Sequence, residues 1–236
     1  MIWNGLEVPS NYYFKDNSDS VLIYCGDCRE ILPELPKVDL VLTDPPYGIS
    51  KKHKGEPFLA GDTINLLPII LPLLYKSLKD DGGIFIFAAT KLLHETLWQF
   101  QTYFKLHNII IWDKVNARYP YQKSNFWRQY EPIIYGSKGL FELAEGKHTD
   151  IMTFPIDNPM ANDRYMTVQK PISLVKSILQ ATKESTDLIL DPFLGSGTTA
   201  IASKSLNRKC IGIEIEEKYC EIAAKRCSQS VMKLAI

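Results

Sequence analysis

A glycine-rich turn near the C-terminus places the tightest limit on how this chain can fold. Residues 187–202 read DLILDPFLGSGTTAIA, so an apolar run is followed by glycines and then by a helix-forming segment. This order predicts a strand, a tight turn and a helix, the repeating unit of a sheet covered by helices. A further apolar run ends at the acid Glu214, and only 22 residues follow that acid. They are too few for the other half of such a sheet, so the N-terminal part of the chain must supply it.

The rest of the chain alternates short apolar runs with amphipathic stretches, which is typical of a doubly wound α/β sheet. We therefore predict an α/β fold in a single domain over residues 1–236. The helix expected at 67–78 contains Pro72, which would kink it or move its start, and it should close at the turn formed by 80–83. The expected strands are Val21–Cys25, Val38–Thr43, Ile84–Ala88, Asn108–Trp112, Pro132–Tyr135, Asp187–Leu190 and Cys210–Glu214. The other expected helices are Lys91–Tyr103, Ile172–Thr182, Thr198–Leu206 and Glu217–Cys227.

The composition limits the compartment and the partners. Lys and Arg number 27, as do Asp and Glu, so the net charge gives no general attraction for nucleic acid. Five cysteines, an odd number, indicate reduced thiols. The sequence shows no apolar run of membrane-spanning length and no signal peptide, so we expect a soluble, cytoplasmic protein. Cys25 and Cys28 form a Cys-x-x-Cys without two further ligands at suitable spacing, so no metal site is expected.

The glycine turn has the character of a ligand site. Glycines leave room for a ligand against the first turn of the following helix. The run Gly195–Ala200 fits both a nicotinamide fingerprint and an S-adenosylmethionine loop, so both readings stay open on this run alone. The preceding Asp191 favours the methyl donor, because a carboxylate would repel a pyrophosphate but could bind the amino group of methionine. Glu214 stands where it could accept hydrogen bonds from ribose hydroxyls.

A second motif follows the expected strand at 38–43. Asp44, Pro45, Pro46 and Tyr47 leave that strand at its carboxyl end, where α/β sheets bind ligands. Consecutive prolines fix the backbone and remove two N–H donors, which leaves a rigid strip with a carboxylate, free carbonyls and an aromatic ring. Such a strip could accept both hydrogens of an aromatic amine and stack on its ring. Methyl transfer to that amine would then be a direct displacement and would need no nucleophilic cysteine.

With both motifs, the chain resembles the beta class of amino-group DNA methyltransferases, in which the motif order is circularly permuted. The resemblance covers nearly the whole sequence. It is carried by Gly26-Asp27, Asp44–Tyr47, Gly82–Phe87, Trp112–Lys114 with Asn116, Glu131–Gly139, Gln169–Pro171, Asp191–Thr199 and Glu214. Two features depart from the pattern. Met166-Thr167-Val168 replaces the usual His-Pro-Thr, and the insert at 139–165, where the target-recognition region is expected, is short.

The resemblance implies a doubly wound, mostly parallel seven-stranded sheet of the S-adenosylmethionine-dependent methyltransferase type, with one antiparallel strand. It implies a site-specific DNA methyltransferase acting on the N6 amine of adenine in double-stranded DNA, on a flipped base. The implied catalytic residues are Asp44, Pro45, Pro46 and Tyr47. The implied cofactor-binding residues are Asp27, Asp44, Lys170, Asp191, Pro192, Phe193, Gly195, Ser196, Gly197, Thr198, Thr199 and Glu214.

Two irregular segments are candidates for contact with DNA. One follows the proline strip and is basic, and the other interleaves aromatic and basic residues, a mixture suited to stacking and phosphate contact. In the second segment Tyr119, Tyr121, Phe126 and Trp127 are alternatively core residues. The expected DNA contacts are Lys51, Lys52, Lys54, Arg118, Tyr121, Lys123, Trp127 and Arg128.

Other activities remain as alternatives. The amine could belong to cytosine N4, to RNA or to a protein amide; an idle DNA-binding subunit or a dehydrogenase would fit parts of the pattern. Cytosine C5 methylation does not fit, because its nucleophilic cysteine typically follows a proline and no cysteine here does. The sequence is compatible with a homodimer and shows no motif of a partner nuclease.

Overall fold

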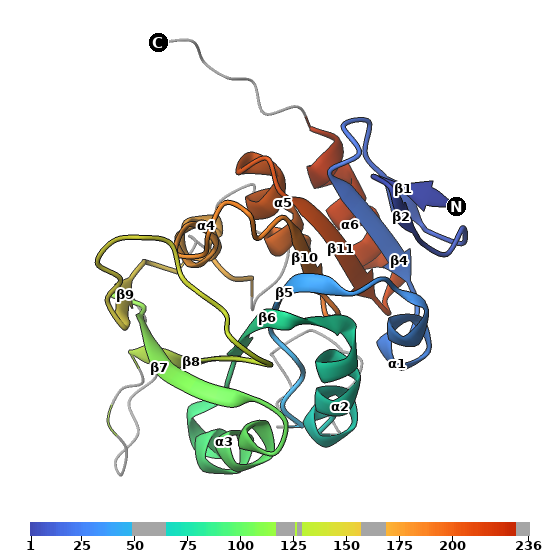
Figure 1. Ribbon diagram of the computed structural model, residues 1–236. Coiled ribbons are helices and arrows are strands. Elements are labelled where there is room, and N and C mark those ends of the chain that lie inside the picture. Colours follow the sequence, from blue (N-terminus) through green and yellow to red (C-terminus); the bar gives the residue numbers. More distant parts are fainter. Residues whose placement is uncertain (49–64, 117–125, 127–128, 157–168, 230–236) are drawn as a thin grey trace.

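A nine-stranded sheet forms the centre of the protein (Figure 1). The computed structural model describes residues 1–48, 65–116, 126, 129–156 and 169–229. In these residues the strand order is β3-β4-β11-β10-β5-β6-β8-β7-β9. The strands are β3 (Phe14–Lys15), β4 (Val21–Cys25), β5 (Val38–Thr43), β6 (Leu78–Phe87), β7 (Lys105–Asp113), β8 (Tyr130–Ser137), β9 (Ile151–Thr153), β10 (Leu188–Asp191) and β11 (Lys209–Glu214).

The seven longer strands confirm the expected sheet. Strands β4, β11, β10, β5 and β6 are parallel, and β8 is inserted antiparallel between β6 and β7. The two short edge strands extend this sheet to nine: β3 pairs antiparallel with β4, and β9 pairs parallel with β7. With two and three residues, they are too short for an alternating pattern to reveal them in the sequence.

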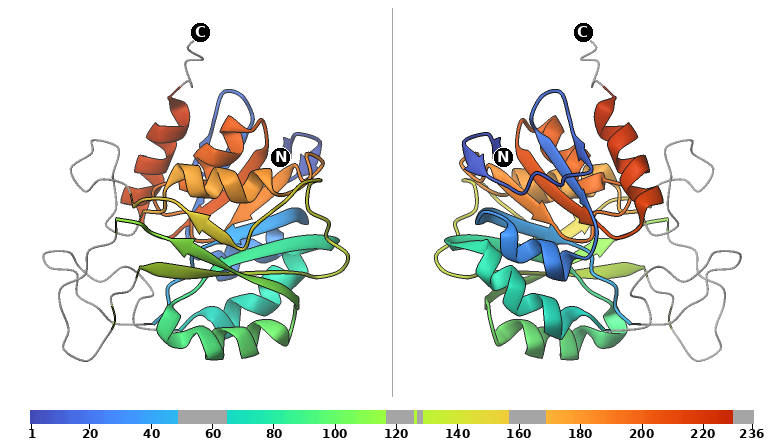
Figure 2. Two further views of the ribbon diagram at one scale, coloured as in Figure 1. Left: turned by 90° about the vertical axis from the view of Figure 1, so that its left-hand side faces the viewer. Right: turned by 90° about the vertical axis from the view of Figure 1, so that its right-hand side faces the viewer.

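Helices cover both faces of the sheet, and strand alternation explains why (Figure 2). Successive side chains of a strand point to opposite faces. In β5, Val41 packs with the helices α2 and α3, whereas Leu40 and Leu42 pack with α4. Helix α6 covers the outer part of the second face, over β4 and β11. The helices are α1 (Cys28–Ile31), α2 (Leu67–Ser77), α3 (Leu93–Gln101), α4 (Ile172–Gln180), α5 (Thr198–Ser205) and α6 (Glu217–Ser228).

The turn expected at 80–83 is wrong. Helix α2 keeps Pro72 inside it and ends at Ser77, and β6 begins directly at Leu78, so these residues belong to the strand. The glycines here serve close packing: a Cβ on Gly82 would lie 2.7 Å from the Leu78 side chain, and one on Gly83 would lie 2.7 Å from the Phe141 ring. The pairing of β6 with β5 shifts its register between Leu78 and Gly83, so the glycines mark a crowded bulge inside the strand.

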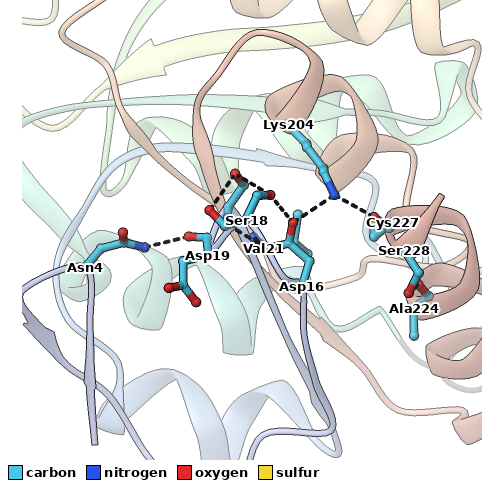
Figure 3. Close-up of polar contacts among 10 residues, drawn as sticks. Asn4, Asp16, Ser18, Asp19, Val21, Lys204, Ala224, Cys227 and Ser228 are labelled. Carbon is cyan, nitrogen blue, oxygen red and sulfur yellow. Dashed lines mark hydrogen bonds and ion pairs between the residues drawn. The ribbon is translucent and has the colours of Figure 1, made fainter. Parts of the chain in front are cut away.

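A buried carboxylate fastens the N-terminal edge to the rest of the molecule (Figure 3). Asp16 accepts the backbone N–H groups of Ser20 and Val21, each at 2.7 Å, and pairs with Lys204 at 2.8 Å. The Lys204 ammonium also donates to the Cys227 carbonyl oxygen at 2.7 Å. Burial opposes the charge of Asp16, but Lys204 and the backbone donors outweigh it and lower its pKa. The β3–β4 hairpin is thereby tied to α5 and α6, the two helices beside the glycine turn.

The outer elements complete the described fold. A small hairpin of β1 (Ile2–Trp3) and β2 (Leu6–Glu7) forms a separate two-stranded sheet. Across the parts of the chain that the structure describes, no helix has the length and apolar character needed to cross a membrane.

Candidate active site

The carboxyl ends of four neighbouring parallel strands bring the sequence motifs together. Strands β5, β10, β11 and β4 are adjacent, so Asp44, Asp191, Glu214 and Asp27 follow or end them at one edge of the sheet. A direct contact joins the two main motifs: the Thr43 hydroxyl donates to Asp191 Oδ1 at 2.9 Å. Residues that lie almost 150 positions apart thus border one site.

The glycine turn is shaped by its backbone. Gly195 and Gly197 have φ angles of +54° and +89°, a conformation that side chains disfavour. A Cβ on Gly197 would lie 2.9 Å from the Cβ of Ala223 in α6, so the close packing of this helix also requires glycine. The turn ends at the N-terminus of α5, where Thr198 begins the helix.

Glu214 is held against this turn. Its Oε2 accepts the backbone N–H of Gly195 at 2.8 Å, and its Oε1 accepts that of Glu216 at 2.9 Å. Each carboxylate oxygen keeps further lone-pair capacity for hydroxyl donors. Burial raises the pKa of Glu214 despite these donors. A fixed acid beside a glycine turn can accept hydrogen bonds from hydroxyl groups, which is compatible with the ribose contact expected from the sequence.

Asp191 is deeply buried at the end of β10. Its Oδ1 accepts the Thr43 hydroxyl and the backbone N–H of Phe193, the latter at 3.1 Å. Burial raises the pKa of Asp191 to about 6, although these hydrogen bonds favour its ionised form. A cation bound near Asp191 would stabilise the ionised form of its carboxyl group.

Arg226, in helix α6, contacts the glycine turn, and sequence reasoning missed it. Its guanidinium donates to the Ser196 carbonyl oxygen at 2.6 Å and to the Ser196 hydroxyl at 3.0 Å, and that hydroxyl donates to Gln169 at 3.0 Å. Arg226 is only 8 % exposed. The signal was present, since Arg226 follows Ala223 by three positions on the buried stripe of α6.

Asp27 caps a short helix that the sequence did not predict. Its Oδ1 accepts the backbone N–H of Arg29 at 2.9 Å at the start of α1, and the Arg29 side chain pairs with the same carboxylate. These hydrogen bonds lower the pKa of Asp27. Its position beside the end of β11 is compatible with the expected contact to the adenine ring of the cofactor.

The proline strip carries an acid with two partners. The Tyr47 hydroxyl donates to Asp44 Oδ1, and the Lys170 ammonium pairs with Asp44 Oδ2. The Tyr47 contact differs from the purely stacking role expected from the sequence. Burial raises the pKa of Tyr47 well above its usual value, and the negative charges of Asp44 and Glu131 raise it further.

Lys170 extends this contact to a second carboxylate. Its ammonium lies 3.0 Å from Glu131 Oε1 and 4.9 Å from the centre of the Phe87 ring. Glu131 Oε2 in turn accepts from Lys114 at 2.6 Å. The family resemblance implied that Lys170 contacts the cofactor, and it assigned no individual role to Glu131 or Lys114. In the structure Lys170 pairs with Asp44 and with Glu131, and Glu131 pairs with Lys114.

The expected DNA contacts lie outside the described residues, namely Lys51, Lys52, Lys54, Arg118, Tyr121, Lys123, Trp127 and Arg128; so do Tyr119 and Met166–Val168. Among the four aromatic residues that could have been core, only Phe126 is described. Its side chain is 99 % exposed, which excludes a core role for it.

The described part of the 139–165 insert is fastened to the sheet. Strand β9 pairs with β7, and the Trp112 indole N–H donates to the Phe154 carbonyl oxygen at 2.7 Å. Asn116 exchanges two side-chain hydrogen bonds with the backbone of Ile156, at 2.8 and 3.0 Å. Residues 151–156 are therefore tied to the end of β7 that leads to Lys114, and 157–165 are not described.

The cysteines lie mostly in the core. Cys220 and Cys227 are seven positions apart and are buried on one stripe of α6. Within the described ranges, no three or more potential metal ligands come together.

Comparison with known proteins shows similarity to DNA methyltransferases over most of the chain. A family model described as DNA methylase, for N6 and N4 methylation, matches residues 38–225. The type II methyltransferase M.HinfI of Haemophilus influenzae is 27% identical over 251 residues, covering 90% of this chain and 70% of that protein. The DNA adenine methyltransferase YhdJ of Escherichia coli is 26% identical over 245 residues, covering 89% of this chain and 83% of that protein.

Solved structures share the fold. The crystal structure of M1.HpyAVI aligns with a TM-score of 0.68 at 26% identity, covering 89% of this chain and 100% of that one. The cytosine-N4-specific PvuII DNA methyltransferase aligns with a TM-score of 0.75 at 17% identity, covering 97% of this chain and 92% of that one. With the proline strip preceding the glycine turn and both meeting at one edge of the sheet, the chain belongs to the N6/N4 family of amino-group DNA methyltransferases.

Proposed function

We propose that this DNA methyltransferase transfers a methyl group to the N6 amine of adenine in double-stranded DNA, on a base flipped out of the helix. The observation that carries the proposal is the placement of Asp44, which begins the proline strip beside the glycine turn and is held between Tyr47 and Lys170. Asp-Pro-Pro-Tyr usually accompanies adenine methylation in this family, and YhdJ is named an adenine methyltransferase. Cytosine N4 is the alternative amine.

Members of this family use S-adenosylmethionine, which supplies an electrophilic methyl group on a positively charged sulfur. The residues present fit this cofactor. Glu214, fixed by two backbone donors, is proposed to accept hydrogen bonds from the ribose hydroxyls, and buried Asp191 is proposed to bind the methionine amino group. Asp27 is proposed for the adenine ring. The remaining proposed contacts are Pro192, Phe193, Gly195, Ser196, Gly197, Thr198 and Thr199.

Asp44 acts on the amine. The lone pair of an exocyclic amine is delocalised into the ring, so the amine is a poor nucleophile. Accepting one N–H at Asp44 and the other at the Pro45 carbonyl oxygen would turn that lone pair toward the methyl group. As the new N–C bond forms and the bond from the methyl carbon to sulfur breaks, positive charge develops on nitrogen, and the Asp44 carboxylate offsets it. The methylated nitrogen then passes one proton to the Asp44 carboxylate, which accepts its N–H, and becomes neutral.

Tyr47 has two tasks in this scheme. Its ring stacks on the flipped base, and its hydroxyl orients Asp44. A carboxylate oxygen has two lone pairs, so Asp44 Oδ1 can accept the amine while it keeps the Tyr47 hydrogen bond. The basic segment with the expected DNA contacts Lys51, Lys52 and Lys54 follows this strip directly in the sequence.

Nucleoside mass spectrometry tests the proposal directly. The purified protein is incubated with S-adenosylmethionine and genomic DNA lacking methylated bases, and the DNA is digested to nucleosides. N6-methyladenine with the wild type, and none with Asp44→Ala, is expected. N4-methylcytosine alone would show that cytosine, and not adenine, is the target base. If no methylated base forms under conditions where the cofactor binds, DNA is not the substrate.

A further inference from the structure

Four charged side chains of alternating sign lead away from the proposed amine site. Lys114 pairs with Glu131, Glu131 with Lys170, and Lys170 with Asp44; we call these four residues the charge ladder. They come from four separate segments: the chain after β7, strand β8, the residues before α4 and the strip after β5. The ladder exists only because the antiparallel strand β8 is inserted beside β6.

The ladder is largely removed from water. The side chains of Lys170 and Lys114 are each 12% exposed and that of Glu131 is 15% exposed. Burying a charge is costly unless it is paired, so removing one member leaves its neighbour uncompensated. Glu131 is the member with a cation on both sides, and burial disfavours its charge more than any other influence on it. Lys170 and Lys114 together outweigh burial and lower the pKa of Glu131.

We propose that Glu131, itself held by Lys114, is a positioning residue that keeps Lys170 protonated and directed at Asp44. The inference rests on the proposed role of Asp44 toward the amine. Its consequence for the reaction is that Lys170 fixes Asp44 Oδ2 and leaves Oδ1 for the substrate. Without Glu131, a Lys170 side chain that loses its proton would no longer pair with Asp44.

The surroundings of Lys170 support this role. Its burial favours the neutral amine, and Asp44 and Glu131 more than offset that effect, so the pKa of Lys170 lies above its usual value. Among the residues that the structure describes, the groups that face Lys170 are these two carboxylates and the Phe87 ring. Tyr47 and Asp191 interact with Asp44, and Lys114 pairs with Glu131. Loss of Glu131 removes one of the two stabilising carboxylates while burial persists.

The sign of the pH dependence follows. In the wild type, a raised pKa keeps Lys170 protonated throughout the working range. In Glu131→Gln the pKa of Lys170 falls, so its charge is present at low pH and is lost as the pH rises through the new value. A merely structural role for Glu131 would instead reduce the rate equally at every pH.

Single-turnover methylation of DNA between pH 6 and 10 tests the inference. Glu131→Gln should lose about 100-fold at pH 9, as expected for a displaced reacting group, and should recover at lower pH. Arginine stays charged at these pH values, so Glu131→Gln combined with Lys170→Arg should lose the alkaline decline that Glu131→Gln alone shows. Asp187→Asn, which removes the carboxylate partner of Lys209 at the opposite end of β10, is the matched control and should leave the profile unchanged.

A second measurement does not depend on activity. NMR titration of ¹³C-labelled lysine side chains reports the Lys170 pKa directly, and Lys170→Arg identifies its signal. A lower Lys170 pKa in Glu131→Gln than in the wild type supports the inference even if the wild type methylates no DNA, an outcome that would refute only the proposed function. If Glu131→Gln does not fold, Lys114→Met should still give a several-fold loss without alkaline decline, because Lys170 then keeps both carboxylates.

An unchanged Lys170 titration in Glu131→Gln would overturn the inference. So would a rate loss that is equal at all pH values, or an alkaline decline that persists with arginine at position 170. With Lys114→Met as the only folded variant, a wild-type rate would overturn it.

Discussion

The glycine turn and the charge ladder border the same site but are built in different ways. The turn is one contiguous segment, and its backbone fixes it. Gly195 and Gly197 have positive φ angles, and the backbone N–H groups of Gly195 and Glu216 donate to the Glu214 carboxylate. The ladder joins side chains from four segments, and paired charges fix it. We infer that the turn sets the affinity for the cofactor, whereas the ladder sets the rate of the chemical step.

Removal of Asp44 should have the largest effect. Asp44→Ala should abolish methyl transfer while leaving the affinity for S-adenosylmethionine nearly unchanged, because Asp44 acts on the amine and not on the donor. Single-turnover rates and calorimetric titration of the cofactor measure the two properties. A large loss of cofactor affinity would mean that the strip and the turn cannot be separated as proposed.

Glu214→Ala should show the opposite pattern. Loss of a charge-assisted hydrogen bond to ribose should weaken cofactor binding by about 1–3 kcal/mol, and saturating cofactor should restore most of the rate. Calorimetry gives the affinity and single-turnover kinetics the rate at saturation. Unchanged affinity would remove Glu214 from the cofactor site.

Cofactor affinity should also depend on pH through Asp191. Its pKa of about 6 in the cofactor-free protein means that it is ionised at neutral pH and becomes protonated as the pH falls below about 6. Only the ionised form attracts the methionine amino group, so affinity should weaken by up to about tenfold per pH unit below this value. Asp191→Asn should bind weakly with no such dependence; the same slope in that variant would assign the titration to another group.

Tyr47→Phe should have the smallest effect. The substitution keeps the ring and removes the hydroxyl that donates to Asp44. One hydrogen bond is worth about 1 kcal/mol, so a loss of roughly fivefold in single-turnover rate is expected, with no change in DNA affinity. A loss as large as that of Asp44→Ala would place the hydroxyl, and not the ring, at the centre of its role.

Sequence reasoning was strong where a motif is contiguous. The proline strip, the glycine turn and the seven longer strands could be predicted, because an apolar run followed by Asp-Pro-Pro-Tyr or by glycines is visible in a single stretch. The order of the motifs also predicted the permuted topology.

The remaining features depend on packing between distant segments. Glu131 and Lys170 are 39 positions apart and meet only through the insertion of β8 in the sheet. Gly82 and Gly83 resembled a turn because glycine marks both turns and crowded strands, and the Leu78 and Phe141 side chains that distinguish these cases are known only from the fold.

The proposed division of roles is that Asp44 acts on the amine in the chemical step, whereas the Tyr47 ring binds the flipped base. Single-turnover methylation of adenine paired normally or opposite a mismatch tests it, since a mismatch lowers the cost of extruding the base. On matched DNA, Asp44→Asn should lose on the order of 10²–10³ in rate, and Tyr47→Ala should lose about 1–3 kcal/mol of base binding. The mismatch should partly restore Tyr47→Ala and leave Asp44→Asn impaired. Equal restoration of both variants, or a wild-type rate in Asp44→Asn, would contradict the account.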